Sequence, residues 1–270
     1  MWEALQFEFM RNAVTAGLLV SLICGVLGTL VVVNRIVFIS GGIAHAAYGG
    51  IGLGLYFGVS PALGATLFSV AISMVMGVAS IKSKERADTI IGVMWALGMA
   101  LGIIFTELTP GYNVDLMSYL FGSILSVPGS DIWYMLCLNL VVLLFVFYFY
   151  KELVAMSYDE EFSFVVGIPV RALYFALLGL ISLSVVMIIR VVGLILVIAL
   201  LTIPPFIAEK YTGSLGKMMV LASLLSMVFT LAGLRVSYKF KHASGATIIM
   251  VAGVGFFLSL AFDAVAARRR

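Results

Sequence analysis

Charge is scarce in this sequence. Asp, Glu, Lys and Arg together make up only 11% of its 270 residues, whereas about 25% is usual for a soluble domain. Apolar residues make up 63%, more than the surface of a water-soluble protein can hide. These proportions exclude a disordered tail and an ordinary cytosolic enzyme, and they indicate an integral membrane protein.

Cysteine and histidine are also few. Cys24 and Cys137 both lie within long apolar stretches, which is not the pattern of a disulfide framework or a zinc knuckle. With only His45 and His242, the chain cannot form a His-Glu-x-x-His zinc site. The net charge of +3 does not indicate a nucleic-acid partner, because basic residues in membrane proteins mainly set orientation. We expect no catalytic residues.

One segment imitates part of a phosphate-binding loop. Gly213 to Met218 is two residues short of that motif, and Met218 replaces the hydroxyl residue that would hold Mg²⁺. We therefore expect no cofactor in this chain. If ATP is consumed, a separate subunit must bind ATP and Mg²⁺.

Nine apolar stretches are long enough to cross a bilayer, which needs roughly 20 apolar residues per helix. They predict an all-α polytopic membrane protein with eight or nine transmembrane helices, folded as a single transmembrane domain over residues 1–270. Two stretches, one rich in glycine and one containing Pro204 and Pro205, are expected to form broken helices near a transport path. Eight spans would follow if one of these two were re-entrant. The expected spans are approximately residues 13–33, 41–58, 62–80, 89–106, 133–150, 172–189, 191–208, 218–236 and 245–265.

The distribution of basic residues predicts the orientation. Most Lys and Arg residues fall on one side of the membrane if the spans alternate strictly and the arginine tail, residues 268–270, is cytoplasmic. The longest external segment, about 107–132, contains no Lys or Arg. This asymmetry supports a cytoplasmic C-terminus.

The external segment of about 107–132 is more than a connector. Its apolar content is consistent with a short amphipathic element against the mouth of the helix bundle, or with a capping helix beneath the lipid headgroups. Glu107 and Asp115 flank this mouth and could attract a cation, so we assign both to an outer gate.

The internal segment of about 151–171 is acidic, then apolar, and ends in a Gly-Ile-Pro turn. An acidic, partly apolar helix of this kind is suited to a groove on a soluble partner, although a solvated loop is the simpler interpretation. The residues that would form the contact are Asp159, Glu160, Glu161, Phe162, Gly167 and Pro169.

His45 is the sharpest candidate for function. Ionisable residues within membrane spans are rare and costly, and His45 lies in a stretch of small residues that lets helices approach closely. A neutral imidazole there could coordinate a metal ion or relay a proton; a hydrogen bond between helices is the structural alternative. The residues assigned to helix packing or the translocation path are Gly41, Gly49, Gly50 and Pro204.

Four stretches together resemble one family, the permease subunits of bacterial ABC importers for zinc, manganese and ferrous iron. Arg35 to Gly54 is similar to the family's Arg, Phe-Gly-Asp-Ala-x-Ser-His-Ala and glycine-rich run. Val114 to Leu125 resembles its Asp-Leu-x-x-Tyr-Leu-Phe-Gly stretch. Val192 to Ala208 resembles its Val-Gly-x-Leu-Leu-Val-x-Ala-Leu-Leu-x-x-Pro signature, and Ser244 to Ile248 resembles its Ser-Gly-x-x-Ile motif.

The resemblance implies several partners and a location. A second copy of the chain, two ATP-binding cassette subunits and an extracytoplasmic metal-binding protein would complete the importer in the cytoplasmic (inner) membrane of a prokaryote, surrounded by lipid. ATP hydrolysis by the partner would drive alternating access. The segment that would couple the chain to the ATP-binding subunits is about 151–171.

One departure from the family pattern concerns the metal. The family's Asp four residues before the His is Gly41 here, its Ser one residue before is Ala44, and a His found in the fourth span of many zinc importers matches Ala96. Because the carboxylate that would favour manganese is missing and imidazole suits zinc, we expect zinc first, then manganese or iron. The alternatives are an ABC permease for a metal chelate (siderophore, haem or cobalamin) and a secondary transporter without a nucleotide-binding partner.

Overall fold

The computed structural model describes residues 6–110, 122 and 124–267. Within these ranges every regular element is helical, and nine helices are long and apolar enough to cross a membrane. They coincide with the nine stretches expected from the sequence, with ends that differ by up to five residues. The prediction of an all-α, multi-pass membrane protein is confirmed.

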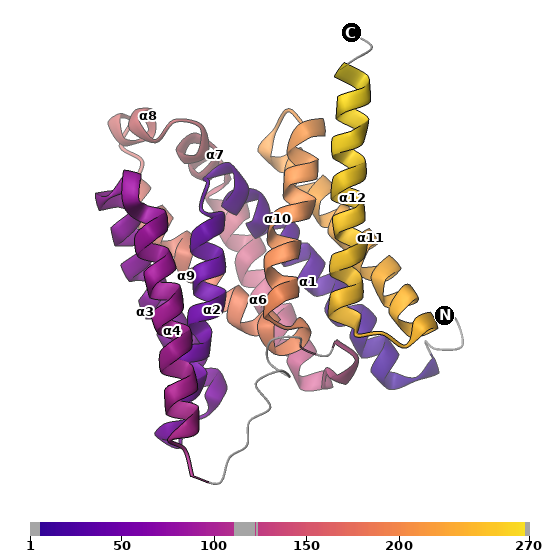
Figure 1. The fold of residues 1–270 in the computed structure, drawn as a ribbon. Helices are drawn as coiled ribbons and strands as arrows, with labels where there is room; N and C mark the ends of the chain where they lie inside the picture. Colours follow the sequence, from indigo (N-terminus) through magenta and orange to yellow (C-terminus); the bar gives the residue numbers. More distant parts are fainter. Residues whose placement is uncertain (1–5, 111–121, 123, 268–270) are drawn as a thin grey trace. The chain divides into compact units, whose positions relative to one another are not determined.

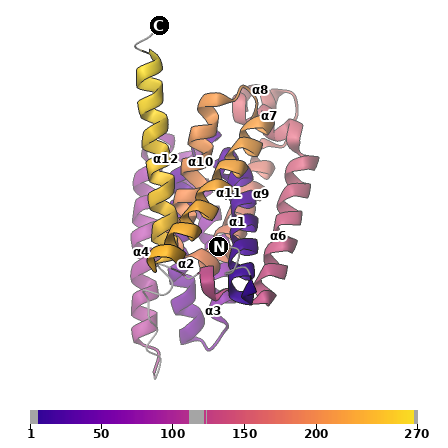
Figure 2. The same ribbon diagram turned by 90° about the vertical axis from the view of Figure 1, so that its right-hand side faces the viewer.

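The chain forms two compact units, made of residues 1–33, 120–143 and 191–270, and of residues 34–119 and 144–190. Figures 1 and 2 show the helices of each unit in two views. The elements of the first unit are α1 (Glu8–Val33), η3 (Ile124–Ser126), most of α6 (Gly129–Tyr148), α10 (Leu194–Tyr211), α11 (Leu215–Phe240) and α12 (Ser244–Ala267). Those of the second unit are α2 (Val37–Tyr56), α3 (Pro61–Lys82), η2 (Lys84–Arg86), α4 (Ala87–Glu107), α7 (Tyr150–Tyr158), α8 (Glu160–Val165) and most of α9 (Val170–Val192).

In the first unit, α1 packs against α10 and α11 through small residues. A Cβ atom on Gly25 would overlap Ser223 of α11, and one on Gly17 would lie 2.8 Å from Thr230 Cγ2. The Ser21 and Thr230 hydroxyl oxygens are 3.1 Å apart, within hydrogen-bonding distance. Small side chains therefore bring two helices into backbone contact, as is common between membrane helices.

Helix α10 contains two consecutive prolines and is nevertheless continuous from Leu194 to Tyr211. Proline has no N–H, so Pro205 leaves the carbonyl of Leu201 without its usual partner in the helix. That carbonyl faces α1 at Gly28, where a Cβ atom would lie only 2.6 Å from the Leu201 oxygen. Helix α1 therefore packs directly against α10 at the prolines. The break in the helix that was expected there does not occur.

In the second unit, α2 packs against both α3 and α4 (Figure 1). Gly50 of α2 and Gly64 of α3 approach so closely that a Cβ on either residue would overlap the other's carbonyl oxygen. A Cβ on Gly52 would overlap the carbonyl oxygen of Gly102 in α4, and one on Gly102 would overlap the carbonyl oxygen of Tyr48 in α2. The glycine-rich stretch was expected to break the helix, but α2 is continuous from Val37 to Tyr56, because its glycines provide contact surfaces for two neighbours.

Residues with positive φ mark the ends of several helices. Arg35 (φ 57°) lies between α1 and α2, Gly58 (φ 68°) follows α2, and Gly193 (φ 84°) separates α9 from α10. Pro61 begins α3, a position where its missing N–H costs nothing. The chain therefore reverses or bends between the spans, while each span remains one helix.

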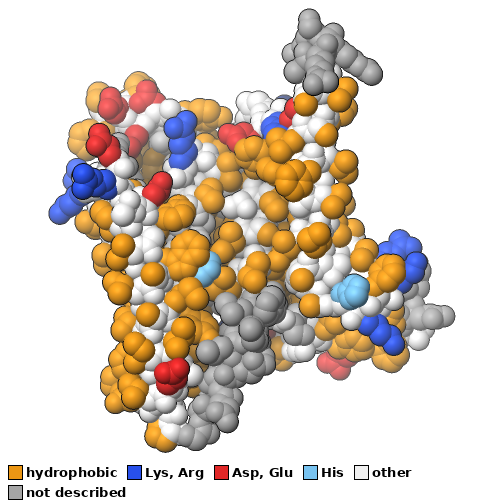
Figure 3. Space-filling model, in the orientation of Figure 1, with side chains coloured by type: hydrophobic (Ala, Val, Ile, Leu, Met, Phe, Trp, Pro, Cys, Tyr) orange, Lys and Arg blue, Asp and Glu red, His pale blue; other side chains and the backbone are white. Residues whose placement is uncertain are grey.

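The long sides of the helices are covered mainly by hydrophobic side chains, and charged side chains gather near the helix ends (Figure 3). Large exposed apolar residues such as Leu67, Leu140, Val220 and Phe257 lie within spans. A lipid environment accounts for this exposure, since lipid-facing surfaces need no polar cover.

Candidate functional site

His45 lies in the middle of α2 and is half-buried in the second unit. Its Nδ1 is 2.8 Å from the carbonyl oxygen of Gly41, one helical turn earlier. A carbonyl can only accept, so Nδ1 carries the proton and donates. In the neutral imidazole this leaves Nε2 with its lone pair, the state in which histidine binds a metal ion or accepts a proton.

Trp95 of α4 lies against the imidazole, with ring centroids 3.8 Å apart and planes inclined by 34°. The close approach of α2 and α4 produces this contact. Gly98, one turn after Trp95, packs on Ala46, and a Cβ on Gly98 would lie only 2.9 Å from the Ala46 Cα. Sequence reasoning missed Trp95. The available signal was its place beside Ala96, the position matched to a family histidine.

The described residues offer few other ligands near His45. Among residues 6–110, 122 and 124–267, no group of three or more His, Cys, Asp or Glu side chains could hold a metal ion. A Cβ built on Gly41 would meet no atom within 4 Å, so open space lies where the family pattern has a carboxylate. A cation at His45 would thus keep water or take ligands from elsewhere.

Of the two residues assigned to an outer gate, the structure describes only Glu107, and it lies far from His45 along the helices. Glu107 is the exposed last residue of α4, twelve positions after Trp95, which corresponds to about 18 Å along a helix at 1.5 Å per residue. Asp115 lies outside the described residues, as do all of residues 111–121 and residue 123 of the external element predicted at about 107–132. The gate assignment stays a prediction.

The segment predicted to couple to a partner forms two short helices, α7 and α8, where one acidic helix was expected. Asp159 separates them in an extended conformation, and its Oδ1 accepts a 2.8 Å hydrogen bond from the Phe162 amide. Aspartate is a preferred N-cap residue, so it ends one helix and begins the next. Gly167, with φ 91°, then turns the chain toward Pro169 and α9.

Helix α8 and the residues on either side of it expose an acidic and apolar surface. Asp159, Glu160 and Glu161 are exposed, and acidic side chains gather at this end of the molecule, around α8 (Figure 3). The apolar members are Phe162, Phe164, Val165 and Val166, which are 60–82% exposed. We call this surface, residues 159–166, the α8 surface.

The glycines and proline assigned to packing or to the path have different roles. Gly49 and Gly50 are contact residues: a Cβ on Gly49 would lie 2.8 Å from the Gly98 carbonyl oxygen, and Gly50 meets α3 as described above. Gly41 has no such contact. Pro204 is buried in α10 and belongs to the first unit, whereas His45 belongs to the second.

Comparison with known proteins identifies the family. The model of the ABC 3 transport family matches residues 6–263, almost the whole chain. This chain belongs to the ABC 3 transport family. The resemblance found in the sequence motifs is thereby confirmed, and membership of this family of ABC transport proteins agrees with the nine apolar helices.

Individual proteins are similar to this chain over nearly the full length. An uncharacterized membrane protein of Synechocystis sp. is 52% identical over 262 residues, which cover 97% of this chain and 93% of that protein. The manganese transport system membrane protein MntC of Halalkalibacterium halodurans is 33% identical over 97% of this chain and 89% of its own length. The structure of PsaBC from Streptococcus pneumoniae, in complex with Fab, superposes with a TM-score of 0.85 at 29% identity, covering 95% of this chain and 93% of that one.

Proposed function

We propose that this chain is the membrane-spanning permease of an ATP-driven importer for a divalent transition-metal ion. The observation that carries the proposal is a half-buried histidine with a metal-competent nitrogen, held inside an apolar helix of an ABC 3 family protein. Ionisable side chains at such positions mark ion pathways. His45 is therefore the residue that the ion contacts during passage.

Manganese is the first cargo we propose. The sequence alone favours zinc, because imidazole suits zinc and the carboxylate is absent. Imidazole also binds other first-row metals, however, so one histidine discriminates poorly among them. Similarity to a manganese transport protein over 97% of this chain supports manganese more than the single substitution at Gly41 supports zinc.

ATP hydrolysis in this proposal belongs to separate subunits. The chain has no complete phosphate-binding loop, so two ATP-binding subunits bind ATP and Mg²⁺ beneath two copies of the permease. An extracytoplasmic binding protein delivers the ion. The chain itself is not an enzyme.

The α8 surface is the contact that we propose for the ATP-binding subunit. Its exposed phenylalanines lie among carboxylates, which would match an apolar groove with a basic rim. Asn34, just before α2, donates a 3.0 Å hydrogen bond to Ser157 of α7, so the α8 surface is attached to the beginning of the helix that carries His45. Movement of α8 would reach α2 through this attachment.

The basic residues of the second unit support a cytoplasmic location for this end. Six of the unit's seven Lys and Arg residues lie between α1 and α2, from the last residue of α3 to the start of α4, or in the first turns of α7 and α9, as the positive-inside rule expects. They are Arg35, Lys82, Lys84, Arg86, Lys151 and Arg171. With nine spans, the C-terminus would also be cytoplasmic.

Metal-dependent ATPase activity tests the proposal. The chain and its ATP-binding subunit would be purified together in lipid nanodiscs, and ATP hydrolysis measured with excess Mg²⁺ while Mn²⁺, Zn²⁺ or Fe²⁺ is added with the delivery protein. We expect Mn²⁺ to stimulate ATP hydrolysis by the wild type and not by His45→Ala. Because the ATP-binding subunit is unchanged in this variant, the variant also controls for Mn²⁺ replacing Mg²⁺ in the ATPase. Absence of any complex with an ATP-binding subunit would overturn the proposed role as the permease of an ATP-driven importer. A stable complex that responds to no ion would instead favour a metal chelate.

A further inference from the structure

Trp95 is placed to control how His45 presents its free nitrogen. The imidazole can rotate about two bonds, and two contacts oppose that rotation. The Gly41 carbonyl binds Nδ1 at 2.8 Å, and the indole of Trp95 covers the ring at a centroid distance of 3.8 Å. Together they fix both the tautomer and the plane of the ring.

The indole lies across one face of α2. Phe38, Gly41 and His45 are three and four residues apart, so they share this face. Trp95 contacts the aromatic rings at both ends of it, with 3.8 Å to His45 and 5.9 Å to Phe38 between ring centroids. Between the two rings, Gly41 has no side chain and open space around its Cβ position. The aromatic rings of Phe38, Trp95 and His45 therefore lie beside the open space at Gly41.

Close backbone contacts between α4 and α2 hold Trp95 in this position. Gly98 packs on Ala46, the residue next to His45, so α4 cannot withdraw Trp95 without separating from α2. Gly49 and Gly102 extend the same contact toward the ends of the helices. The position of the indole is therefore set by the fold, and the indole in turn limits the motion of the imidazole.

We propose that Trp95 is the positioning residue of the metal site, and that it determines the affinity of the site by holding the His45 imidazole ready to bind. This inference rests on the proposed function. A ligand held in its binding orientation loses less conformational freedom when the ion arrives, so the ion binds more tightly. A cation near the face of an indole is also attracted by the ring itself. In a site without a carboxylate, the fixed orientation of the imidazole and the attraction of the indole contribute a larger share of the binding free energy.

Tryptophan fluorescence gives a direct test. Trp2→Phe and Trp133→Phe together leave Trp95 as the single tryptophan. Mn²⁺ is paramagnetic and quenches an indole that it approaches closely, so Mn²⁺ titration of this variant in nanodiscs should quench the emission in a saturable manner. His45→Ala in the same background should abolish the saturable part. Saturable quenching that survives His45→Ala, or its absence in a protein that still transports Mn²⁺, would overturn the inference.

Transport kinetics separate positioning from a general packing role. Trp95→Ala should raise the KM for Mn²⁺ uptake about tenfold and change the maximal rate by less than twofold, whereas Trp95→Phe, which keeps an aromatic face, should restore most of the affinity. Trp133→Ala is the matched control, because Trp133 is 70% exposed on α6 in the other unit. An unchanged KM in Trp95→Ala, or an equal rise in Trp133→Ala, would contradict the inference.

The two proposals fail in different ways. If the wild-type protein shows no saturable metal uptake, the proposed function is wrong. If wild-type uptake is lost in His45→Ala but Trp95→Ala matches the wild type, only the role of Trp95 is wrong. Should Trp95→Ala not fold, the fluorescence titration still tests the part of the inference that places the ion beside the native indole.

Discussion

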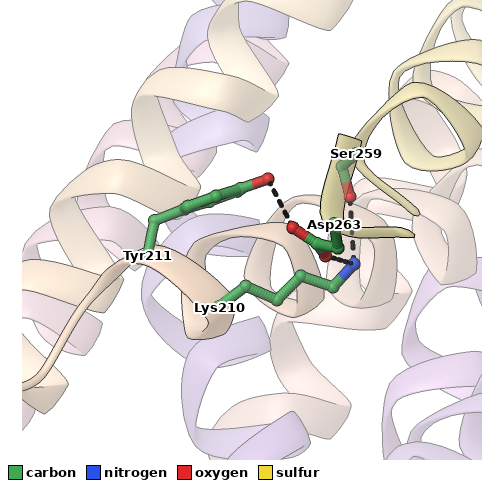
Figure 4. Close-up of polar contacts among 4 residues, drawn as sticks. All are labelled: Lys210, Tyr211, Ser259 and Asp263. Carbon is green, nitrogen blue, oxygen red and sulfur yellow. Dashed lines mark hydrogen bonds and ion pairs between the residues drawn. The ribbon is translucent and has the colours of Figure 1, made fainter. Parts of the chain in front are cut away.

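Lys210 of α10 and Asp263 of α12 form an ion pair, with Nζ and Oδ2 2.8 Å apart. Figure 4 shows the same ammonium group donating to the Ser259 hydroxyl and the Tyr211 hydroxyl donating to the other carboxylate oxygen. Few residues of helix α12 are buried in this unit. The polar cluster therefore joins a weakly covered helix to its neighbour near the end of α10.

Breaking this pair should loosen α12. Lys210 and Asp263 have 19% and 42% of their side-chain surface exposed, so solvent screens the pair in part, and we expect an interaction of about 1 kcal/mol. In a double-mutant cycle, Lys210→Met and Asp263→Asn should each lower the thermal midpoint, and the double variant should lose less than their sum. Thermal unfolding in nanodiscs measures this. Strictly additive losses would show that the two side chains do not interact.

Two glycines of the same helix should respond oppositely to the same substitution. A Cβ on Gly50 would overlap the Gly64 carbonyl and lie 2.7 Å from Phe68 Cβ, whereas one on Gly41 would meet nothing within 4 Å. Overpacking typically costs about 1–3 kcal/mol, while alanine is favoured over glycine in a helix by up to about 1 kcal/mol. Gly50→Ala should therefore lower the thermal midpoint and Gly41→Ala should leave it unchanged or raise it. The reverse order would contradict the packing described for α2.

A carboxylate at position 41 should strengthen metal binding. Gly41 precedes His45 by four residues, on the same face of α2, and it has room for a side chain. Gly41→Asp should lower the KM for Mn²⁺ about tenfold, because a second, charged oxygen ligand joins the imidazole and oxygen ligands suit manganese. Gly41→Asn is the control of equal size without the charge. If both variants lower KM equally, the charge has no role; if neither lowers it, the ion does not bind beside His45.

The α8 surface should be needed for the ATPase partner and not for folding. Phe164, 69% exposed, makes few contacts within the chain, so Phe164→Ala should leave the thermal midpoint unchanged but reduce co-purification of the ATP-binding subunit. Phe57 is the matched control, because it is 68% exposed just beyond α2, at the end opposite Asn34 and its α7 partner Ser157. Loss of the partner in Phe57→Ala, or its retention in Phe164→Ala, would place the docking contact elsewhere.

The sequence predicts the spans well because length and hydropathy decide them. All nine apolar stretches are helices, since a membrane leaves the backbone no other way to satisfy its hydrogen bonds within a single segment. The continuity of α2 and α10 could not be predicted in this way. Glycine and proline weaken an isolated helix, and only the close approach of Gly64 to α2 and of Gly28 to α10 shows why these helices persist.

The candidate site was predicted in part. His45 stands out in the sequence because a charged or ionisable residue in a span is costly. Trp95 does not, since one more aromatic residue in an apolar helix is unremarkable until α4 is known to pack beside α2. Asp159 followed by two glutamates is a signal for a helix start, but no residue pattern indicates that α7 ends immediately before it.

ATP-driven accumulation of Mn²⁺ is the measurement that tests the central claim most directly. Proteoliposomes containing the chain and its ATP-binding subunit, in a right-side-out orientation with ATP inside, would receive radioactive Mn²⁺ and the delivery protein outside, with ADP in place of ATP as the control. The account predicts ATP-dependent accumulation that falls at least tenfold in His45→Ala. Accumulation that is the same with His45→Ala, or that proceeds equally with ADP, would contradict it.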